Sequence, residues 1–323
     1  MAYLLFEEDV RILLSMKQAL EAIEDAFRSL AAGEAVNFPR QRCAAPGIAI
    51  NVLCSVSYKL DAAGLKTYPI VRTDVTVGSS FTFLVYRVST GALIGVMEAN
   101  TLGQIRTGAT SGVAARYLAR PNSRVMTLFG AGWQAESQAA AISCALPGLQ
   151  RINVVGRSAK RTQQFCEQMR ERLRIEVEVA PNVEQAVRDA DIITTATGSH
   201  QPVFDGRWIK PGTHINAVGS NLAEKQEIDA TSVARATRIF VDDWDVARSE
   251  SGDLIAADTQ LGLDWNSVHP LSSLVGNLLP GRKTPEDITL FESHGMGLED
   301  LAAACCVLEQ ARRYGVGKQV PLH

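Results

Sequence analysis

Residues 125–136 read VMTLFGAGWQAE, a run of strand-forming residues that leads through two glycines into a helical pattern. The spacing Gly130-x-Gly132-x-x-Ala135 is that of a dinucleotide-binding turn. In such a turn the first glycine permits the sharp bend, the second lets backbone approach a pyrophosphate, and the small third residue lets helix pack on strand. Because the helix N-terminus also offers oriented N–H groups, the stretch predicts dinucleotide binding, with a plain tight turn as the alternative.

Strand and helix patterns alternate around this stretch. After the first strand and its helix (WQAESQAAAISCAL), strands are predicted at RINVVGRS, IEVEVA, DIITTAT, HINAVGS and RIFVDD, with helices at SAKRTQQFCEQMRERL and NVEQAVRDA. Such alternation predicts βαβ units and a parallel sheet. The predicted fold class is therefore α/β, with a Rossmann-type doubly wound dinucleotide-binding domain over residues 119–296.

The other residues predict a second, α+β domain made of 1–118 and 297–323. Apolar side chains in 7–32 recur mostly every three or four residues, which predicts one helix that stops at Gly33. Between 47 and 100 the segments GIAINVLCSVS, AGLKTYPIVR, GSSFTFLVYRVS and GALIGVMEA predict a largely antiparallel sheet. A helix over 101–119 and a strand-then-helix tail over 288–314 complete the pattern.

Composition excludes several classes of protein. Apolar residues make up 46% of the 323 and charged residues 21%, and the net charge of −3 offers no basic surface to nucleic acid or membrane. The six cysteines form no C-x-x-C pair and the five histidines have no metal-ligand spacing, so we expect reduced, mostly buried thiols and no metal. Without a signal-peptide pattern or an apolar run of about 18 residues, a cytoplasmic protein is expected.

The end of the second predicted Rossmann strand indicates which dinucleotide is bound. Proteins that prefer NAD usually carry an acidic residue here, which accepts from the ribose 2′-OH. This chain has Gly156-Arg157-Ser158 instead. Since Arg157 and Ser158 can bind a 2′-phosphate, NADP(H) is favoured and NAD(H) remains possible. The alternative is that Arg157 stacks on adenine or lies in solvent.

Four cations of the first domain are candidates for a substrate site: Arg40, Arg42, Lys66 and Arg106. Taken singly, each is more often a surface charge, and a lone lysine in a strand usually lies on the solvated face. Taken together, they predict a cationic pocket that binds a carboxylate substrate beside the cofactor.

Six motifs, in order along the chain, carry a resemblance to a known family. They are PRQR (39–42), GLK (64–66), IRTGA (105–109), FGAGWQAESQ (129–138), INAVGSN (215–221) and ITLFESHGMGLEDLAAA (288–304). The set resembles the ornithine cyclodeaminase/μ-crystallin family. This implies a homodimer, a substrate and dimerisation domain built from the N-terminal part plus the C-terminal helix, a central Rossmann domain, and an active site in the cleft between them.

The resemblance also implies roles for individual residues. Lys66 matches the catalytic lysine and Arg106 the arginine that holds the substrate carboxylate. The second carboxylate arginine is Arg42 or Arg40, and Arg42 fits the family's spacing to a following proline better.

Around the cofactor, the resemblance places Thr107 and Thr197 near the phosphates and ribose. Gln134 follows the family's G-x-G-x-Q.

The chain departs from the cyclodeaminases at positions that matter for chemistry. Asn221, still a candidate catalytic position, replaces an aspartate, and Asn51 stands near the position of a glutamate that receives the distal amine of ornithine. A neutral amide cannot act as a base and pairs poorly with ammonium. Glu292 stands where the family has a lysine, and His294 where an apolar residue is usual; His294 is either a proton donor or simply hydrogen-bonded beside the cofactor.

These departures favour an NAD(P)H-dependent reductase or dehydrogenase of a small imino or amino acid, of the Δ1-pyrroline-2-carboxylate or ketimine type. Three alternatives stay open. They are ornithine cyclodeaminase, a lyase that recycles bound NAD+; a 3-hydroxyproline dehydratase; and a non-catalytic, NADPH-binding, crystallin-like protein.

Overall fold

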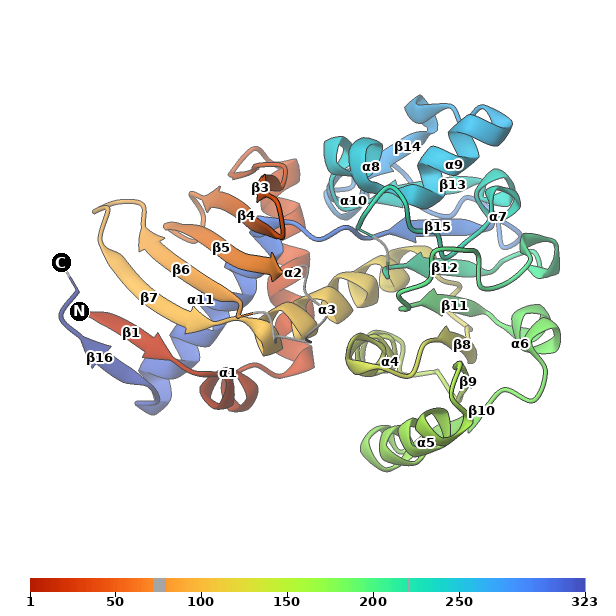
Figure 1. Cartoon of the computed structure of the whole chain (residues 1–323), viewed down its shortest axis with the longest axis horizontal. Helices are drawn as coiled ribbons and strands as arrows, with labels where there is room; N and C mark the ends of the chain where they lie inside the picture. Colours follow the sequence, from red (N-terminus) through yellow and green to blue (C-terminus); the bar gives the residue numbers. More distant parts are fainter. Residues whose placement is uncertain (72–79, 220, 323) are drawn as a thin grey trace. The chain divides into compact units, whose positions relative to one another are not determined.

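The computed structural model describes residues 1–71, 80–219 and 221–322 (Figure 1). The chain folds as two compact units: unit 1 comprises Met1–Arg106 with Met296–His323, and unit 2 comprises Thr107–Gly295. The chain leaves unit 1 inside helix α3 (Asn100–Leu118) and returns just before helix α11 (Gly297–Tyr314).

Unit 1 is built on an eight-stranded sheet of order β16-β1-β7-β6-β5-β4-β2, in which β3 also pairs with β4. The described pairs are antiparallel except β1 with β7. Residues of β5 alternate in burial, and Ala62, Gly64, Lys66 and Tyr68 are the buried ones. The strands are β1 (Ala2–Leu5), β2 (Ala35–Asn37), β3 (Gln41–Ala45), β4 (Ile48–Ser57), β5 (Ala62–Val71), β6 (Thr82–Arg87), β7 (Leu93–Glu98) and β16 (Lys318–Val320).

Two further helices belong to unit 1, where one was predicted over 7–32. They are α1 (Glu7–Leu13) and α2 (Met16–Ala31). The single-helix prediction is wrong because Ser15 starts a new helix: its hydroxyl accepts from the Gln18 N–H, and the Gln18 side chain accepts from the Ser15 N–H. Helix α11 packs against α2 and against strands β4 and β5.

Unit 2 is a doubly wound α/β domain, which confirms the predicted fold class. Its sheet has the order β10-β9-β8-β11-β12-β15-β13-β14, with parallel pairing throughout the described strands. The strands are β8 (Val125–Phe129), β9 (Arg151–Val155), β10 (Glu176–Val179), β11 (Ile192–Thr195), β12 (His214–Ala217), β13 (Arg238–Val241), β14 (Val268–Pro270) and β15 (Thr289–Glu292). The strand order reverses beside β8, which is where such sheets bind ligands.

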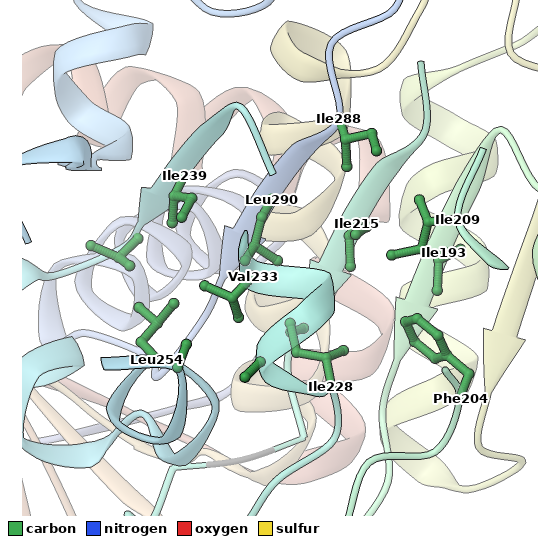
Figure 2. Packing of buried hydrophobic residues seen from close by; sticks show 14 of the residues in the cluster. Ile193, Phe204, Ile209, Ile215, Ile228, Val233, Ile239, Leu254, Ile288 and Leu290 are labelled. Carbon is green, nitrogen blue, oxygen red and sulfur yellow. The ribbon is translucent and has the colours of Figure 1, made fainter. Parts of the chain in front are cut away.

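Helices cover both faces of this sheet, and each face has its own core. On one side Met126 and Leu128 of β8 pack with α4 (Trp133–Ala145) and α5 (Ala159–Leu173). On the other, Ile193, Ile215 and Leu290 pack with Val233 and Leu254 (Figure 2). The helices of this second side are α6 (Val183–Asp189), α7 (Ala230–Arg235), α8 (Trp244–Glu250) and α9 (Gly252–Leu261), and α10 (Leu271–Val275) follows in the chain.

Some expectations need correction. The six cysteines are free, but the prediction that most are buried is wrong: Cys166 is buried, Cys54, Cys305 and Cys306 are half-buried, and Cys43 and Cys144 are exposed. Helices α8 to α10 and strand β14 lie in a region that the sequence patterns left unassigned. Arg72, Gly78 and Ser79, at the ends of two predicted strands, lie outside the described residues. No described helix is long and apolar enough to cross a membrane.

Candidate functional site

The glycine turn after β8 has the geometry of a phosphate cradle. Gly130 has a φ of +114°, and a Cβ there would lie 2.4 Å from the Ala196 carbonyl oxygen, so only glycine fits. Gly132 caps α4, and a Cβ there would meet nothing within 4 Å. Ala135 is fully buried in the core beneath the helix. The open N-terminus of a 13-residue helix therefore fits a pyrophosphate.

A cavity of about 720 Å³ opens beside this turn. Five of the eight predicted cofactor residues line it, among them Thr197 just after β11, so unit 2 has room for a dinucleotide. The lining residues are Phe129, Gly130, Ala131, Gly132, Val155, Gly156, Arg157, Ser158, Arg161, Thr162, Ala196, Thr197, Gly198, Ser199 and Val203.

Three predicted cofactor residues are not among those that line the cavity. Ala135 lies beneath it in the core. The Gln134 amide donates to the Ser137 hydroxyl at 3.0 Å. Thr107 uses its carbonyl oxygen to accept from the Gln138 side chain at 3.4 Å.

The end of β9 presents two exposed arginines to the same cavity. Arg157 and Ser158 follow the strand, and Arg161 lies in the first turn of α5. Ser158 caps this helix, and its carbonyl oxygen accepts from the Thr162 hydroxyl at 2.8 Å. Sequence reasoning missed Arg161; its signal was its place three residues after a helix-capping serine.

Glu227, which sequence reasoning also missed, holds the loops that follow β11 and β12. Its carboxylate accepts from the Thr197 N–H at 2.5 Å, the Gly219 N–H at 2.6 Å and the Thr195 hydroxyl at 2.8 Å. Burial raises the pKa of Glu227, and these hydrogen bonds oppose the shift. Glu227 therefore sets the position of Thr197 at the cavity wall.

In unit 1 the predicted lysine lies on the buried face of its strand, contrary to the usual place of a lone cation. The Lys66 ammonium is 2.6 Å from a carboxylate oxygen of Asp300 in α11, and its side chain is 4% exposed. Burial lowers the pKa of Lys66 to about 8; Asp300 opposes this shift, while Arg106 and Arg40 add to it. A lysine with this pKa can exchange a proton near neutral pH.

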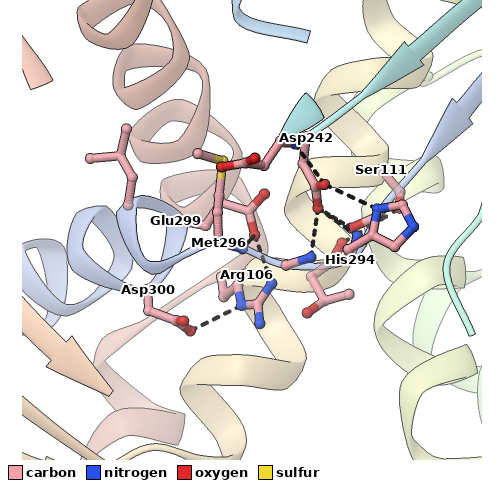
Figure 3. A network of polar contacts seen from close by, with 12 residues as sticks. Arg106, Ser111, Asp242, His294, Met296, Glu299 and Asp300 are labelled. Carbon is pink, nitrogen blue, oxygen red and sulfur yellow. Dashed lines mark hydrogen bonds and ion pairs between the residues drawn. The ribbon is translucent and has the colours of Figure 1, made fainter. Parts of the chain in front are cut away.

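Arg106 joins the same cluster from helix α3. Its Nε donates to Asp300 at 3.0 Å and its Nη1 to Glu299 at 2.6 Å (Figure 3). The structure thus brings together Lys66 and Arg106, as predicted, and adds two carboxylates that were not predicted. The signal for them was a pair of adjacent acids, Glu299 and Asp300, in the otherwise apolar stretch 297–308.

Arg42 lies at the same sheet but has a different partner. It sits on β3, where its Nε donates to the Asn51 side-chain oxygen at 3.0 Å. Arg40 precedes the strand and is near enough to Lys66 to affect its charge. Asn221, in unit 2, is half-buried in the loop after β12.

The two residues that sequence reasoning left open, Glu292 and His294, form one buried charged group with Asp242. The His294 ring nitrogens lie 3.4 Å from Asp242 and 3.5 Å from Glu292, and the side chain is 2% exposed. Asp242 also accepts from the backbone N–H groups of His294 and Gly295 (Figure 3). Burial would lower the pKa of His294, but both carboxylates raise it to about 10, so the ring is an imidazolium.

Comparisons with known proteins agree on one family. A family model described as ornithine cyclodeaminase/mu-crystallin family matches residues 2–315. A Δ1-pyrroline-2-carboxylate reductase of Bacillus cereus is 31% identical over 273 residues, 83% of this chain and 83% of the reductase.

Solved structures of enzymes with related names are also similar to this chain. The Thermococcus litoralis Δ1-pyrroline-2-carboxylate reductase, in complex with NADH and L-proline, matches with a TM-score of 0.92 and 31% identity, over 98% of this chain and 100% of that one. An archaeal alanine dehydrogenase dimer with bound NAD matches with a TM-score of 0.92 and 30% identity, over 100% and 99%.

The His294 group makes stability depend on pH in a defined direction. The folded-state pKa is about 10 against an ordinary value of 6.5, so the ion pairs stabilise fully below pH 6.5 and are lost as pH rises through 10. We expect His294→Gln to cost about 3 kcal/mol at pH 6 and much less at pH 10.5, measured by urea unfolding. The exposed His200→Gln is the control, and a pH-independent loss at position 294 would contradict the assignment.

Proposed function

This chain belongs to the ornithine cyclodeaminase/mu-crystallin family, and from that premise we propose that it is an NAD(P)H-dependent reductase of a small imino acid. The family match confirms the resemblance inferred from six sequence motifs. The names of its relatives, pyrroline-2-carboxylate reductase and alanine dehydrogenase, belong to enzymes of this chemistry. The substrate proposed here is of the Δ1-pyrroline-2-carboxylate or ketimine type.

The observation that carries the proposal is the buried ammonium group of Lys66. Reduction of a C=N bond requires a proton at nitrogen. An ammonium group with a pKa of about 8 can donate that proton near neutral pH. A carboxylate oxygen of Asp300 holds this group at 2.6 Å. Lys66 is therefore the catalytic residue of the proposal and Asp300 its positioning residue.

Arginines of unit 1 supply the charge that a substrate carboxylate needs. Arg42 is the proposed carboxylate ligand, with Arg40 adding positive charge. Arg106 already binds Glu299 and Asp300, so we assign it a double role: it keeps Asp300 in place and adds charge to the carboxylate site.

The cradle of unit 2 supports a bound nicotinamide dinucleotide, which supplies the hydride for the imine carbon. Gly130 and Gly132 leave room for its pyrophosphate, and Thr197 is held at the cavity wall by Glu227. Among the lining residues of the described chain there is no acid to accept from a ribose 2′-OH, whereas Arg157 and Arg161 can bind a 2′-phosphate. We therefore favour NADP(H).

Amide side chains argue against the cyclodeaminase alternative. Asn51 adjoins Arg42, and Asn221 lies after β12; neither can take a proton as a base. Ring closure from a diamine requires such proton transfers, whereas imine reduction takes only one proton, which Lys66 supplies.

An exposed apolar end of the β4–β5 hairpin supports a homodimer. Ile48, Ile50 and Val71 are each more than 40% exposed, and Ile48 is opposite Val71 in the strand register, so the three project from one face. Apolar side chains clustered in this way mark an interface. A second copy of the chain is the proposed partner.

The direct test is loss of NADPH absorbance with Δ1-pyrroline-2-carboxylate. We expect turnover in the wild type and its loss in Lys66→Met, because the variant lacks the proton donor. Ammonia release from L-ornithine without net change in cofactor would contradict the proposal.

The same assay across pH tests the Lys66–Asp300 pair. Activity should fall as pH rises through about 8, where Lys66 loses its proton. Asp300 raises that pKa, so Asp300→Asn should move the fall to lower pH by about 1 to 3 units. Glu8→Gln, which removes an exposed carboxylate on α1, should leave the profile unchanged.

Replacing both arginines of the cavity tests the cofactor preference. In the Arg157→Ala/Arg161→Ala variant, KM for NADPH should rise about tenfold or more and KM for NADH should change little, because only NADPH has the 2′-phosphate. Lys160→Ala removes an exposed cation between them that does not line the cavity, and serves as the matched control. Equal effects on both cofactors would refute the preference.

A further inference from the structure

Asn51 lies on the same face of the unit 1 sheet as the proposed catalytic lysine. In the register of the strands, Asn51 is opposite Arg42 on β3 and Tyr68 on β5. Residues opposite one another in antiparallel strands share a face, and so do residues two apart in one strand. Arg42, Asn51, Tyr68 and Lys66 therefore project from one face.

The orientation of the Asn51 amide follows from its neighbour. Arginine can only donate hydrogen bonds, so the amide oxygen faces the Arg42 Nε, 3.0 Å away. The amide Nδ2 group must then point away from Arg42. Asn51 is fully buried, and no atom in the described part of the chain accepts a hydrogen bond from Nδ2.

A buried N–H donor without an acceptor lowers the free energy of unfolding, because it loses its hydrogen bond to water and gains none. Such a group in a native protein therefore indicates an acceptor from outside the chain. We propose that Asn51 Nδ2 donates to an oxygen in the substrate's side chain, and that the enzyme thereby selects imino acids with a side-chain carboxylate. The inference rests on the proposed reductase function and names the substrate class for that site.

The position of Asn51 suits the far end of a substrate. Lys66, which protonates the imine nitrogen, and Tyr68, which is opposite Asn51, are two residues apart on β5, or about 7 Å along the strand. Asn51 is therefore about 7 Å along the sheet from Lys66. A substrate whose imine nitrogen contacts Lys66 would place its side-chain atoms, beyond the imine carbon, near Asn51.

Charge favours a carboxylate over an ammonium group at this position. Asn51 Nδ2 and the Arg42 guanidinium bound to the same side chain offer donors and positive charge. A side-chain ammonium would meet both without an acceptor, whereas a carboxylate accepts from one and is attracted by the other. An apolar side chain, including the ring of Δ1-pyrroline-2-carboxylate, would leave Nδ2 without a partner, so we expect that imine to be reduced less efficiently than one with a side-chain carboxylate.

The test uses two imines of equal carbon length, formed in place from ammonia and either oxaloacetate or 2-oxobutyrate. Their side chains differ in a carboxylate against a methyl group. We expect wild-type kcat/KM to favour the oxaloacetate imine about tenfold or more, and Asn51 variants to reduce that ratio about 10- to 100-fold. The loss should appear mainly in KM, since Asn51 does not move the proton.

Two variants separate the donor from other effects of Asn51. Asn51→Asp keeps an acceptor for Arg42 but removes the donor, and Asn51→Leu removes both without adding charge. Each should lose the preference, and the exposed Asn122→Asp should retain it. An equal fall in kcat/KM for both imines would overturn the inference, because Asn51 would then serve the carboxylate that both substrates share.

Binding of the product amino acids keeps this inference separate from the proposed function. Affinity for L-aspartate, L-2-aminobutyrate and L-2,4-diaminobutyrate is measured by calorimetry on the wild type and both Asn51 variants with NADP+ present. A preference for L-aspartate that Asn51→Leu abolishes supports the inference even if no imine is reduced, in which case the reductase proposal alone fails. Turnover of both imines with no preference for L-aspartate refutes the inference and leaves the reductase intact.

Discussion

The contact between the Lys66 ammonium and the Asp300 carboxylate, 2.6 Å long and almost wholly buried, joins helix α11 to strand β5 in unit 1. An ammonium removed from water needs a carboxylate within reach, so α11 must bring Asp300 to β5. Asp300 and Glu299 in turn bind Arg106, which ties α3 to the same point. The interaction that protects the fold from an unpaired charge also opposes the lowering of the pKa of Lys66, the proposed proton donor. Stability and the proposed chemistry therefore depend on one ion pair.

Unit 2 also contains buried charged groups, but here they are carboxylates that hold loops in place. The loops after its parallel strands must stay fixed where a dinucleotide would lie, yet they contain few side chains that could anchor them. Glu227 anchors two of these loops through backbone N–H groups, and Asp242 anchors the segment after β15 in the same way. Each buried carboxylate has several donors or an imidazolium beside it, which offsets the cost of leaving water. Buried carboxylates thus hold this edge of the sheet in place through hydrogen bonds and charge.

Local patterns could be predicted from the sequence, and long-range partners could not. Gly130, Gly132 and Ala135 form a motif only six residues long, and that motif, with the strand before it and the helix after it, predicts the cradle and the doubly wound sheet. Ser15 shows the limit at short range, because an apolar period continues through a helix break that only its cap reveals. Asp300 and Glu227 gain their roles from residues far away in the chain, and no spacing rule identifies such acids. The alternation of β5 gave no reason to expect that Lys66 would lie on its buried face.

The path of the chain has a consequence for its synthesis. Unit 1 is interrupted by all of unit 2, and Asp300 binds Arg106 across 194 residues of sequence. On the ribosome, most of unit 2 emerges while the sheet of unit 1 still lacks α11. Until α11 leaves the exit tunnel, Lys66 on β5 lacks the carboxylate of Asp300, and strands β4 and β5 lack the helix that packs against them. The nascent first half is therefore the part of this protein that a chaperone would have to shield.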